Sequence, residues 1–316
     1  MSIIKKLFRV REFTLSLIVI LGILVLSIGN PYFATRANMF GVLASMSTDT
    51  IIAGAMTILF ISGGFDLSVG STLGLCAMIV VKLINAGLPV PAAVLVTIMA
   101  GIAIGSIMGF IISHIEINPF IVTLSGFLIL RSLHLIISGG TSIKNLQKSF
   151  TLIAGYRILN FPIYVIFAFI SILIFDLLLR NNVFFRNNYN LGGNETSAAL
   201  LGINIKKLKL FNYCLTSAMA SVAGIFLASK FNNANIEGSP DTAFSVITAV
   251  ILGGASLKGG KGSVTGTLLG LIIMALLQNA LVLFGLNILW NKVAIGSVLI
   301  LVVIMDSTLS RKTGRQ

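Results

Sequence analysis

The feature of this sequence that most limits its fold is a series of long apolar runs, each with at most one charged residue, separated by polar stretches. An α-helix needs about 20 apolar residues to cross the hydrocarbon core of a bilayer. Hydrophobic residues make up 56% of the 316 residues and charged residues 10%, against about 25% charged residues in a soluble domain. So few charges cannot keep so much apolar surface in water, which excludes a soluble enzyme, a coiled coil and a disordered chain. The sequence therefore predicts an all-α polytopic membrane protein.

About ten transmembrane helices fit into the chain, which we interpret as a single transmembrane domain over residues 1–316. The first run is longer than the core of a usual signal peptide, about 7–15 residues, so we interpret it as a retained helix. The predicted spans are 13–28, 42–62, 68–85, 92–113, 119–138, 162–179, 211–229, 243–257, 264–284 and 288–305.

The basic residues predict which helix ends face the cytoplasm, because Lys and Arg accumulate in cytoplasmic loops. With the N-terminus inside and the helices alternating, 14 of the 22 basic residues fall in cytoplasmic segments, seven fall outside and Arg131 lies within a helix. This bias predicts that the N-terminus and the C-terminus are both cytoplasmic. Merging 243–257 with 264–284 would put the basic C-terminal residues outside, which the same rule disfavours. The net charge of +13 thus reflects membrane orientation and not nucleic-acid binding.

The segment 63–71, Gly-Gly-Phe-Asp-Leu-Ser-Val-Gly-Ser, interrupts two apolar runs. The pair Gly63-Gly64 can end a helix at little cost, because glycine accepts backbone angles that other residues avoid. Asp66 or Ser68 is then expected to cap the next helix, which continues through Gly70. Two interpretations stay open: a tight connector, or a backbone break that lines a pathway or contacts a partner.

A related pattern occurs at 253–263, where Gly253-Gly254 and Gly262 belong to a glycine-rich loop that precedes another helix with small residues. Transporters often contain internal repeats, so the similarity between segments 63–71 and 253–263 favours an internal duplication, although glycine-rich turns also resemble one another by composition. The loop approaches the phosphate-binding P-loop pattern but fails it. Ala255 stands at the leading glycine, and Gly262 stands at the Ser or Thr that should hold magnesium. No nucleotide site is therefore predicted in this chain.

The longest polar stretch, about 180–210, contains a segment that predicts a short helix, Asn-Glu-Thr-Ser-Ala-Ala-Leu-Leu-Gly. Asn194 is a good N-cap, Glu195 lies near the positive end of the helix dipole, and Gly202 is a typical C-terminal stop. The two alanines between them are small, so another surface could approach closely. The segment is either a simple loop helix or a docking element for a cytoplasmic partner.

Charged residues within the predicted helices are few. Asp49 and Arg131 lie at membrane depth, where an isolated charge is costly and is expected to face the bundle interior or a water-filled cavity. Arg131 shares a helix face with His134. These residues could line a pathway, form an internal Asp49–Arg131 pair or have a structural role. We favour separate roles for the two charges, because span membership does not say which helix faces meet.

No residue pattern predicts an enzyme or a metal centre. The chain lacks an HExxH motif, a Ser/His/Asp set on plausible loops and clustered carboxylates, and it has nine acidic residues in all. Cys76 and Cys214 lie in or near apolar runs, without disulfide or metal-ligand spacing.

Four segments, in order and in register, resemble the signature motifs of ribose-type ABC importer permeases: 63–71, 191–203, 249–270 and 277–286. This family comprises the membrane subunits of bacterial importers for pentoses, hexoses and related furanose-like molecules. The resemblance extends from about residue 38 to Asp306. It implies that one short segment forms the helix that couples the permease to its ATPase, namely Asn194, Glu195, Ala198, Ala199 and Gly202.

The resemblance also implies a multi-pass protein of the bacterial inner membrane, with lipid around it and two permease subunits side by side, either two copies or a copy and a paralogue. Two cytoplasmic ABC ATPases bind below, and a periplasmic or lipid-anchored solute-binding protein delivers the solute above. ATP and magnesium then belong to the ATPases, so no cofactor is expected on this chain. Asp49, Arg131 and Asn279 are the predicted pathway residues.

The sequence does not identify the solute. Segments 74–77 and 87–91 resemble permeases for a furanosyl quorum-sensing signal, which is an alternative within the family. In another class, an ion-coupled secondary transporter would need intramembrane acidic residues, for which Asp49 is the convincing candidate. A passive channel would conduct without ATP.

Overall fold

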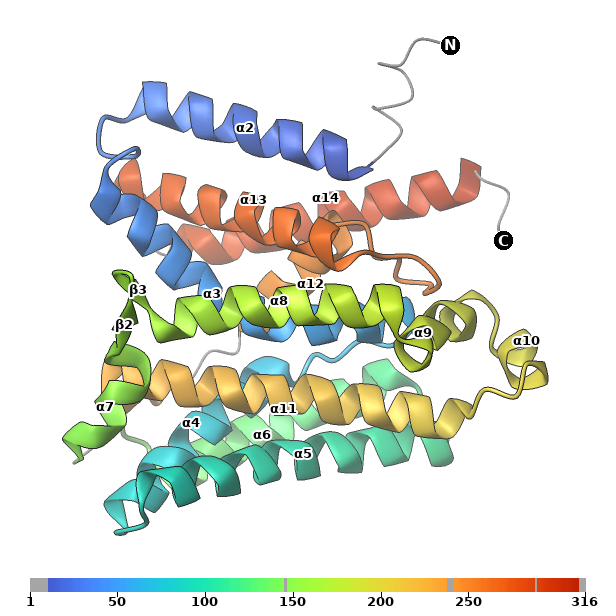
Figure 1. The fold of residues 1–316 in the computed structure, drawn as a ribbon, viewed down its shortest axis with the longest axis horizontal. Helices are drawn as coiled ribbons and strands as arrows, with labels where there is room; N and C mark the ends of the chain where they lie inside the picture. The colour runs from blue at the N-terminus through green and yellow to red at the C-terminus, as the bar shows by residue number, and fades with distance from the viewer. Residues whose placement is uncertain (1–10, 145–146, 238–240, 288, 313–316) are drawn as a thin grey trace.

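A computed structural model describes residues 11–144, 147–237, 241–287 and 289–312. Within these residues a helix lies in each predicted apolar run, and the helices lie side by side between two ends of the molecule (Figure 1). Seven are long and apolar enough to cross a membrane, while α4, α12 and the stretch Leu289–Ile304 of α14 are shorter apolar segments. The all-α polytopic architecture is therefore confirmed. The helices that lie in the predicted apolar runs are α2 (Arg11–Gly29), α3 (Arg36–Ile61), α4 (Val69–Asn85), α5 (Val90–His114), α6 (Pro119–Ser138), α8 (Ile163–Asn181), α11 (Ile205–Phe231), α12 (Thr242–Leu252), α13 (Val264–Leu283) and α14 (Leu289–Lys312).

Short elements mark the two ends of this helical bundle. One end carries α9 (Val183–Gly193) and α10 (Glu195–Leu200), and we call it the α9–α10 end. The opposite end, the α7 end, carries α7 and two small antiparallel sheets that the sequence did not predict, β1 with β4 and β2 with β3. Their bounds are α7 (Lys148–Gly155), β1 (Ile143–Lys144), β2 (Arg157–Ile158), β3 (Phe161–Pro162) and β4 (Asn233–Ala234).

Four predicted boundaries are wrong by five residues or more. Helix α3 begins at Arg36 and not at 42, because the Thr35 side chain caps it by accepting from the Asn38 N–H, and α14 extends to Lys312, beyond the predicted 305. The span predicted at 243–257 ends as α12 at Leu252, because the following glycine pair leaves the helix. The span predicted at 211–229 begins earlier, at Ile205, because the Asn204 side chain caps the helix by accepting from the Lys207 N–H at 3.0 Å. Of the basic residues used to predict orientation, four lie outside the described residues: Lys5, Lys6, Arg9 and Arg315.

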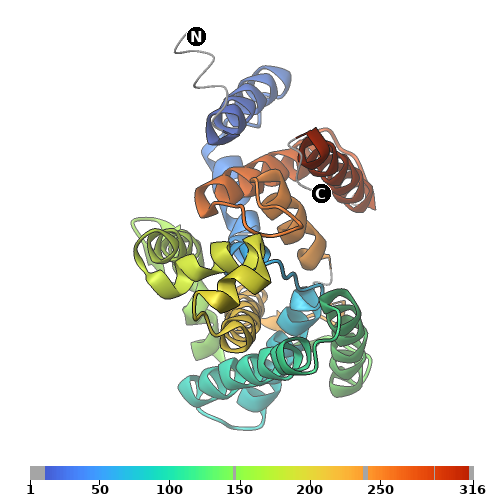
Figure 2. The ribbon, with the colours of Figure 1, turned by 90° about the vertical axis from the view of Figure 1, so that its right-hand side faces the viewer.

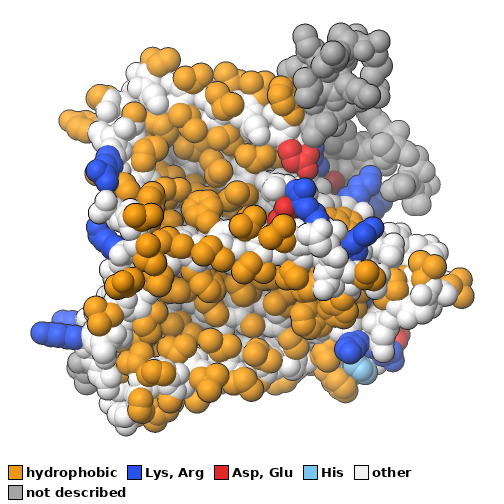
Figure 3. Space-filling model, in the orientation of Figure 1, with side chains coloured by type: hydrophobic (Ala, Val, Ile, Leu, Met, Phe, Trp, Pro, Cys, Tyr) orange, Lys and Arg blue, Asp and Glu red, His pale blue; other side chains and the backbone are white. Residues whose placement is uncertain are grey.

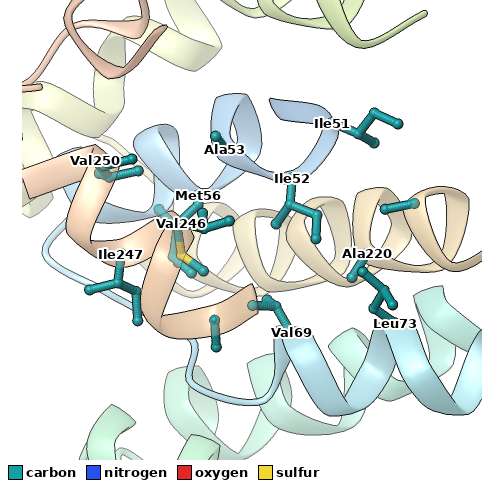
Figure 4. Close-up of a cluster of buried hydrophobic side chains, with 14 of the residues drawn as sticks. Ile51, Ile52, Ala53, Met56, Val69, Leu73, Ala220, Val246, Ile247 and Val250 are labelled. Atoms are coloured by element: carbon teal, nitrogen blue, oxygen red, sulfur yellow. The ribbon is translucent and has the colours of Figure 1, made fainter. Parts of the chain in front are cut away.

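The core of the bundle is built around α3. Residues 50–61 of this helix are all buried, and it packs against α8, α11, α12 and α13. Figure 4 shows Met56 of α3 beside Val246 of α12, and Ala220 of α11 beside Leu73 of α4, all within one buried cluster. Helices from the whole length of the chain therefore share one core.

Helices α5 and α11 approach closely through three glycines spaced four residues apart. A Cβ on Gly101 would lie 2.6 Å from the Ser221 Cβ, and a Cβ on Gly105 would lie 2.5 Å from the Tyr213 carbonyl oxygen. Gly109 faces the backbone of Leu210 in the same way. Small residues at this spacing let two membrane helices pack backbone against backbone.

Apolar side chains also cover the outside of the bundle. Figure 3 shows hydrophobic side chains across the middle of one face, with Lys and Arg toward the two ends. Helix α2 is an extreme case, since the buried residues in it are Leu15 and Val19. A surface of this kind fits the hydrocarbon core of a bilayer, with its two ends in the polar layers.

Candidate functional site

The short helix α10 projects from the α9–α10 end, which faces the viewer in Figure 2. Asn194 is its N-cap, and the Asn194 Oδ1 accepts from the Ser197 N–H at 2.8 Å. At the other end Gly202 has φ +77°. There the Gly202 N–H donates to the Ala199 oxygen and the Ile203 N–H donates to the Ala198 oxygen. The predicted helix is thus present, with the N-cap and the glycine stop that the sequence predicts.

The exposed face of α10 differs from the expected one. Ala198 is buried within this chain, so the surface that approaches it closely belongs to the chain itself, while Ala199 is exposed and open to a partner. The most exposed apolar side chains at this tip are Leu200 at 86% and Leu201 at 70%. Sequence reasoning missed them, although two consecutive leucines in an otherwise polar loop are the signal for an apolar contact surface.

Helix α10 is tied to α11 by an ion pair. The Lys209 Nζ lies 2.8 Å from both carboxylate oxygens of Glu195, and both side chains are partly exposed. An exposed pair of this kind contributes about 0–1 kcal/mol to stability. Its main effect is therefore to orient α10, and not to stabilise the fold.

The first break loop, residues 62–68, joins α3 to α4. Gly63 has φ +84°, which an L side chain rarely adopts. Asp66 is buried, and its Oδ1 accepts from the Ser68 N–H at 2.8 Å and from the Ser68 hydroxyl at 2.6 Å. Ser68 is the N-cap of α4, but its side chain caps no helical N–H, so the capping predicted for the Ser68 side chain is wrong, while Asp66 accepts from the N–H of the N-cap residue itself. The two residues instead close a turn just before the helix.

Asp66 carries an electrostatic cost in this loop. Its Oδ2 is buried and has no hydrogen-bond partner among the described residues. Burial raises the pKa of Asp66 to about 6, and the two hydrogen bonds from Ser68 oppose that shift.

The second break loop, residues 253–263, joins α12 to α13. Gly254 has φ +113°, and a Cβ on Gly253 would lie 2.5 Å from the backbone of Gly266 and of Thr267. Ser263 caps α13, because its hydroxyl accepts from the Gly266 N–H at 3.0 Å. Glycines therefore let α12 and α13 approach closely where the chain turns.

The two break loops meet each other. The Gly260 N–H of the second loop donates to the Ile61 oxygen, at the end of α3, at 2.8 Å. Helix α9 lies against both loops: Gly192 contacts Ile61 and Gly260, and the Tyr189 hydroxyl donates to the Gly262 oxygen at 2.9 Å. The sequence places these motifs far apart, and tertiary packing brings them together beside α10.

A cavity of about 490 Å³ lies where these elements converge, at the α9–α10 end. Its lining contains both acidic and basic side chains. The lining residues include residues of both break loops, of α10 and of the turn between α5 and α6. The polar and charged lining residues are Ser62, Glu116, Asn118, Asn194, Glu195, Lys209, Tyr213 and Lys258.

The three predicted pathway residues lie apart from one another. The Arg131 Nη1 donates to the backbone oxygens of Ile236 (3.0 Å) and Glu237, near the α7 end. Asn279 of α13 exchanges two amide hydrogen bonds with Asn38 of α3, at 2.8 and 3.0 Å. Asp49 is half-buried in α3 and forms no ion pair within the described part of the chain. An Asp49–Arg131 pair is therefore not formed.

Comparisons with known proteins agree with the motifs. Residues 38–303 match the family described as "Branched-chain amino acid transport system / permease component". The chain is 31% identical over 297 residues to the ribose import permease protein RbsC of Haemophilus influenzae, covering 93% of this chain and 92% of that protein. It is 32% identical over 286 residues to RbsC of Bacillus subtilis, covering 90% and 89%.

A third relative is a permease for a different solute. The chain is 31% identical over 303 residues to the autoinducer 2 import system permease protein LsrD of Photorhabdus temperata, covering 93% of this chain and 90% of that protein. These relatives are transport permease subunits and not enzymes. No solved structure matches this chain.

Proposed function

This chain belongs to the family of branched-chain amino acid transport system permease components, and from that premise we propose that it is the membrane-spanning permease subunit of an ATP-binding cassette importer for a monosaccharide or a related furanose-like solute. The observation that carries the proposal is the similarity to ribose import permeases along almost the whole chain. The resemblance seen in the sequence motifs is confirmed by these relatives. The protein is a multi-pass membrane protein, and in bacteria this family resides in the inner membrane.

In this proposal the domain covers residues 1–316 and crosses the membrane ten times, with both termini in the cytoplasm. The alternating course of the helices in Figure 1 supports it, because the beginning of α2 and the end of α14 lie at the α9–α10 end. The basic bias of the loops assigns this end to the cytoplasm. The α7 end then faces outward, toward the incoming solute.

The partners follow from this orientation. Two permease subunits, identical or paralogous, associate with two cytoplasmic ATPases and with a solute-binding protein on the outer side. The loop at about 180–210 docks on the ATPase through α10, whose exposed Leu200 and Leu201 suit an apolar pocket. ATP and magnesium bind on the ATPase, and this chain holds no cofactor.

The physical role of the chain is to convert movement of an ATPase into opening of a pathway. Asn194 and Gly202 fix both ends of α10, so α10 can move as a unit when its partner moves. Asp49 is our proposed polar lining residue of the pathway, since a half-buried carboxylate without an ion pair needs water or solute nearby.

The proposal is tested in proteoliposomes that contain this chain, its cognate ATPase subunit and the cognate solute-binding protein. We expect uptake of labelled D-ribose or of autoinducer 2 that requires ATP and the binding protein. The chain alone should hydrolyse no ATP. Hydrolysis by the chain alone that disappears in Lys261→Ala would contradict the assignment.

The relatives of this chain support two alternative solutes. The ribose import permeases favour a pentose, and the autoinducer 2 permease favours the furanosyl signal. Competition between the two labelled solutes in the same vesicles separates them. Uptake driven by an ion gradient without ATP would instead indicate a secondary transporter, and a leak of solute without ATP or gradient would indicate a channel.

A further inference from the structure

The last turn of α9 is the point where α10 and both break loops come together. Gly192 contacts Ile61 and the neighbouring Gly63 of the first loop, and Gly259 and Gly260 of the second loop. One residue further, Gly193 ends α9, and Asn194 begins α10. Any movement of α10 is therefore applied directly to this contact.

The contact consists of backbone alone. A Cβ on Gly192 would overlap the Ile61 carbonyl oxygen and lie 2.5 Å from the Gly260 nitrogen. A Cβ on Gly259 would lie 2.8 Å from the Gly192 Cα and 2.9 Å from the Gly63 Cα. Because no flexible side chain lies between the segments, a displacement of α9 is not absorbed by a change of rotamer.

Two hydrogen bonds fix the position of α9 in this contact. The Tyr189 hydroxyl, one turn before Gly192, donates to the Gly262 oxygen at 2.9 Å. On the other side, the Asn212 amide of α11 donates to the Asn188 Oδ1 at 2.7 Å, and both asparagines are buried. Helix α9 is thus bound to the second loop and to α11 at the same level.

The far side of the second loop is held by the first two described residues of α2. Arg11 donates to the Ile251 oxygen at 2.9 Å, and the Ser263 hydroxyl donates to the Glu12 carboxylate at 2.9 Å. A cation at the C-terminal end of α12 and an anion at the N-terminal end of α13 both suit the helix dipoles. With one flank fixed to α2, the loop responds to α9 by changing the angle between α12 and α13.

We infer that Gly192 is the positioning residue that transmits movement of α10 to both break loops, so that α3–α4 and α12–α13 shift together in each transport cycle. The inference rests on the proposed importer function. It assigns to Gly192 a role in the coupling of ATP hydrolysis to solute movement, and not in docking of the ATPase or in contact with the solute.

The chain offers a matched pair of variants for the test. Gly192→Ala puts a methyl group into the backbone contact, whereas Gly193→Ala, at the adjacent position, meets no atom within 4 Å. Both variants are assembled with the ATPase and binding protein in proteoliposomes. The measurements are the melting temperature, the bound ATPase, and the number of ATP molecules hydrolysed per solute imported.

For Gly192→Ala we expect normal binding of the ATPase and a rise in ATP used per solute of about 5- to 150-fold, the range of ordinary coupling between two sites. Gly193→Ala should match the wild type. If Gly192→Ala imports solute at the wild-type ratio, the inference is overturned.

A second variant keeps the test decisive if Gly192→Ala does not assemble. Tyr189→Phe removes only the hydroxyl that holds α9 on the second loop, and should raise the ATP used per solute about two- to tenfold, as the loss of one hydrogen bond allows. The control is Tyr156→Phe, which removes the hydroxyl of an exposed tyrosine at the α7 end. An unchanged ratio in Tyr189→Phe overturns the inference. Failure of the wild-type assembly to import either solute would instead contradict the proposed function.

Discussion

Single polar residues hold the irregular backbone of this protein in place. Arg131 lies in a helix that the sequence assigns to the membrane, yet its guanidinium binds two backbone oxygens of the segment that follows β4. Asn279 likewise joins α13 to α3 through an amide pair. Polar groups in helices of this kind serve as interhelical contacts as readily as they serve a solute pathway.

Asp66 gives a prediction at the residue scale that depends on pH. Because its pKa is raised to about 6 in the folded protein, the native state still holds a proton that the unfolded chain has released above about pH 4. Its contribution to stability is therefore complete below about pH 4 and is lost as the pH rises through about 6, by about 3 kcal/mol in all. We expect Asp66→Asn to reduce the fall in melting temperature between pH 4 and pH 7.

The asparagine variant retains an oxygen that accepts from Ser68, so the turn is preserved. The control is Asp241→Asn, which replaces a half-exposed aspartate at the α7 end, in an ion pair with Lys292. If the melting temperatures of Asp66→Asn and the wild type fall equally between pH 4 and pH 7, Asp66 does not ionise at a buried position and the prediction is wrong.

At the scale of elements, some helices are buried in the core of the bundle and others extend from its end. Helix α3 is buried along most of its length, whereas α10 is six residues long and carries exposed leucines at its tip. A helix this short is not stable alone and depends on its caps and on packing against α9 and α11, while the ion pair orients it. In the proposed importer, its exposed leucines form the contact with the ATPase.

We expect Leu200→Asp to weaken binding of the ATPase about ten- to a hundredfold, the effect of losing one buried leucine from an interface. Insertion and melting temperature should not change, because Leu200 is 86% exposed in this chain. The matched control is Leu159→Asp, at a position 87% exposed in the β2–β3 turn at the α7 end. Equal binding by both variants would place the ATPase contact elsewhere.

At the scale of the whole molecule, Lys and Arg side chains lie toward the two ends of the bundle, and apolar side chains cover the surface between them. At the α7 end, Arg36 and Arg157 line a cavity of about 440 Å³ together with Phe40 and Tyr164. An adjoining cavity of about 360 Å³ shares Arg157 and Tyr164 and adds Lys230. No acidic residue lines either cavity, so this part of the described surface favours an acidic partner.

If the solute-binding protein docks at the α7 end, the double variant Arg36→Glu, Arg157→Glu should slow its association and reduce the dependence of that rate on salt. The rate is measured on the permease in nanodiscs over a range of ionic strength. Lys206→Glu, an exposed charge at the α9–α10 end, is the control and should leave the rate unchanged. An unchanged rate in the double variant would exclude this surface as the docking site.

Local chemistry was sufficient to predict the apolar helices, their class and the short helix α10. A long run of apolar residues forms a transmembrane helix wherever it lies in the chain. The bilayer solvates the apolar side chains but offers no hydrogen-bond partners to the backbone, so the backbone groups bond within the helix. Asn194 and Gly202 similarly determine the ends of α10 by bonds to residues within a few positions. The cytoplasmic assignment of loops came from charge, which is also a property of the sequence alone.

Tertiary structure alone decided which surfaces meet. The sequence did not show that Ala198 faces inward, that Asp49 and Arg131 form no ion pair in the described part of the chain, or that Gly192 joins both break loops. These facts depend on the packing of helices from distant parts of the chain, and in an almost uniformly apolar sequence the pattern of residues does not single out one helix face as the partner of another. The pairing of helix faces is determined by their shape and by close approach of the backbone, which small residues such as Gly105 and Gly260 permit.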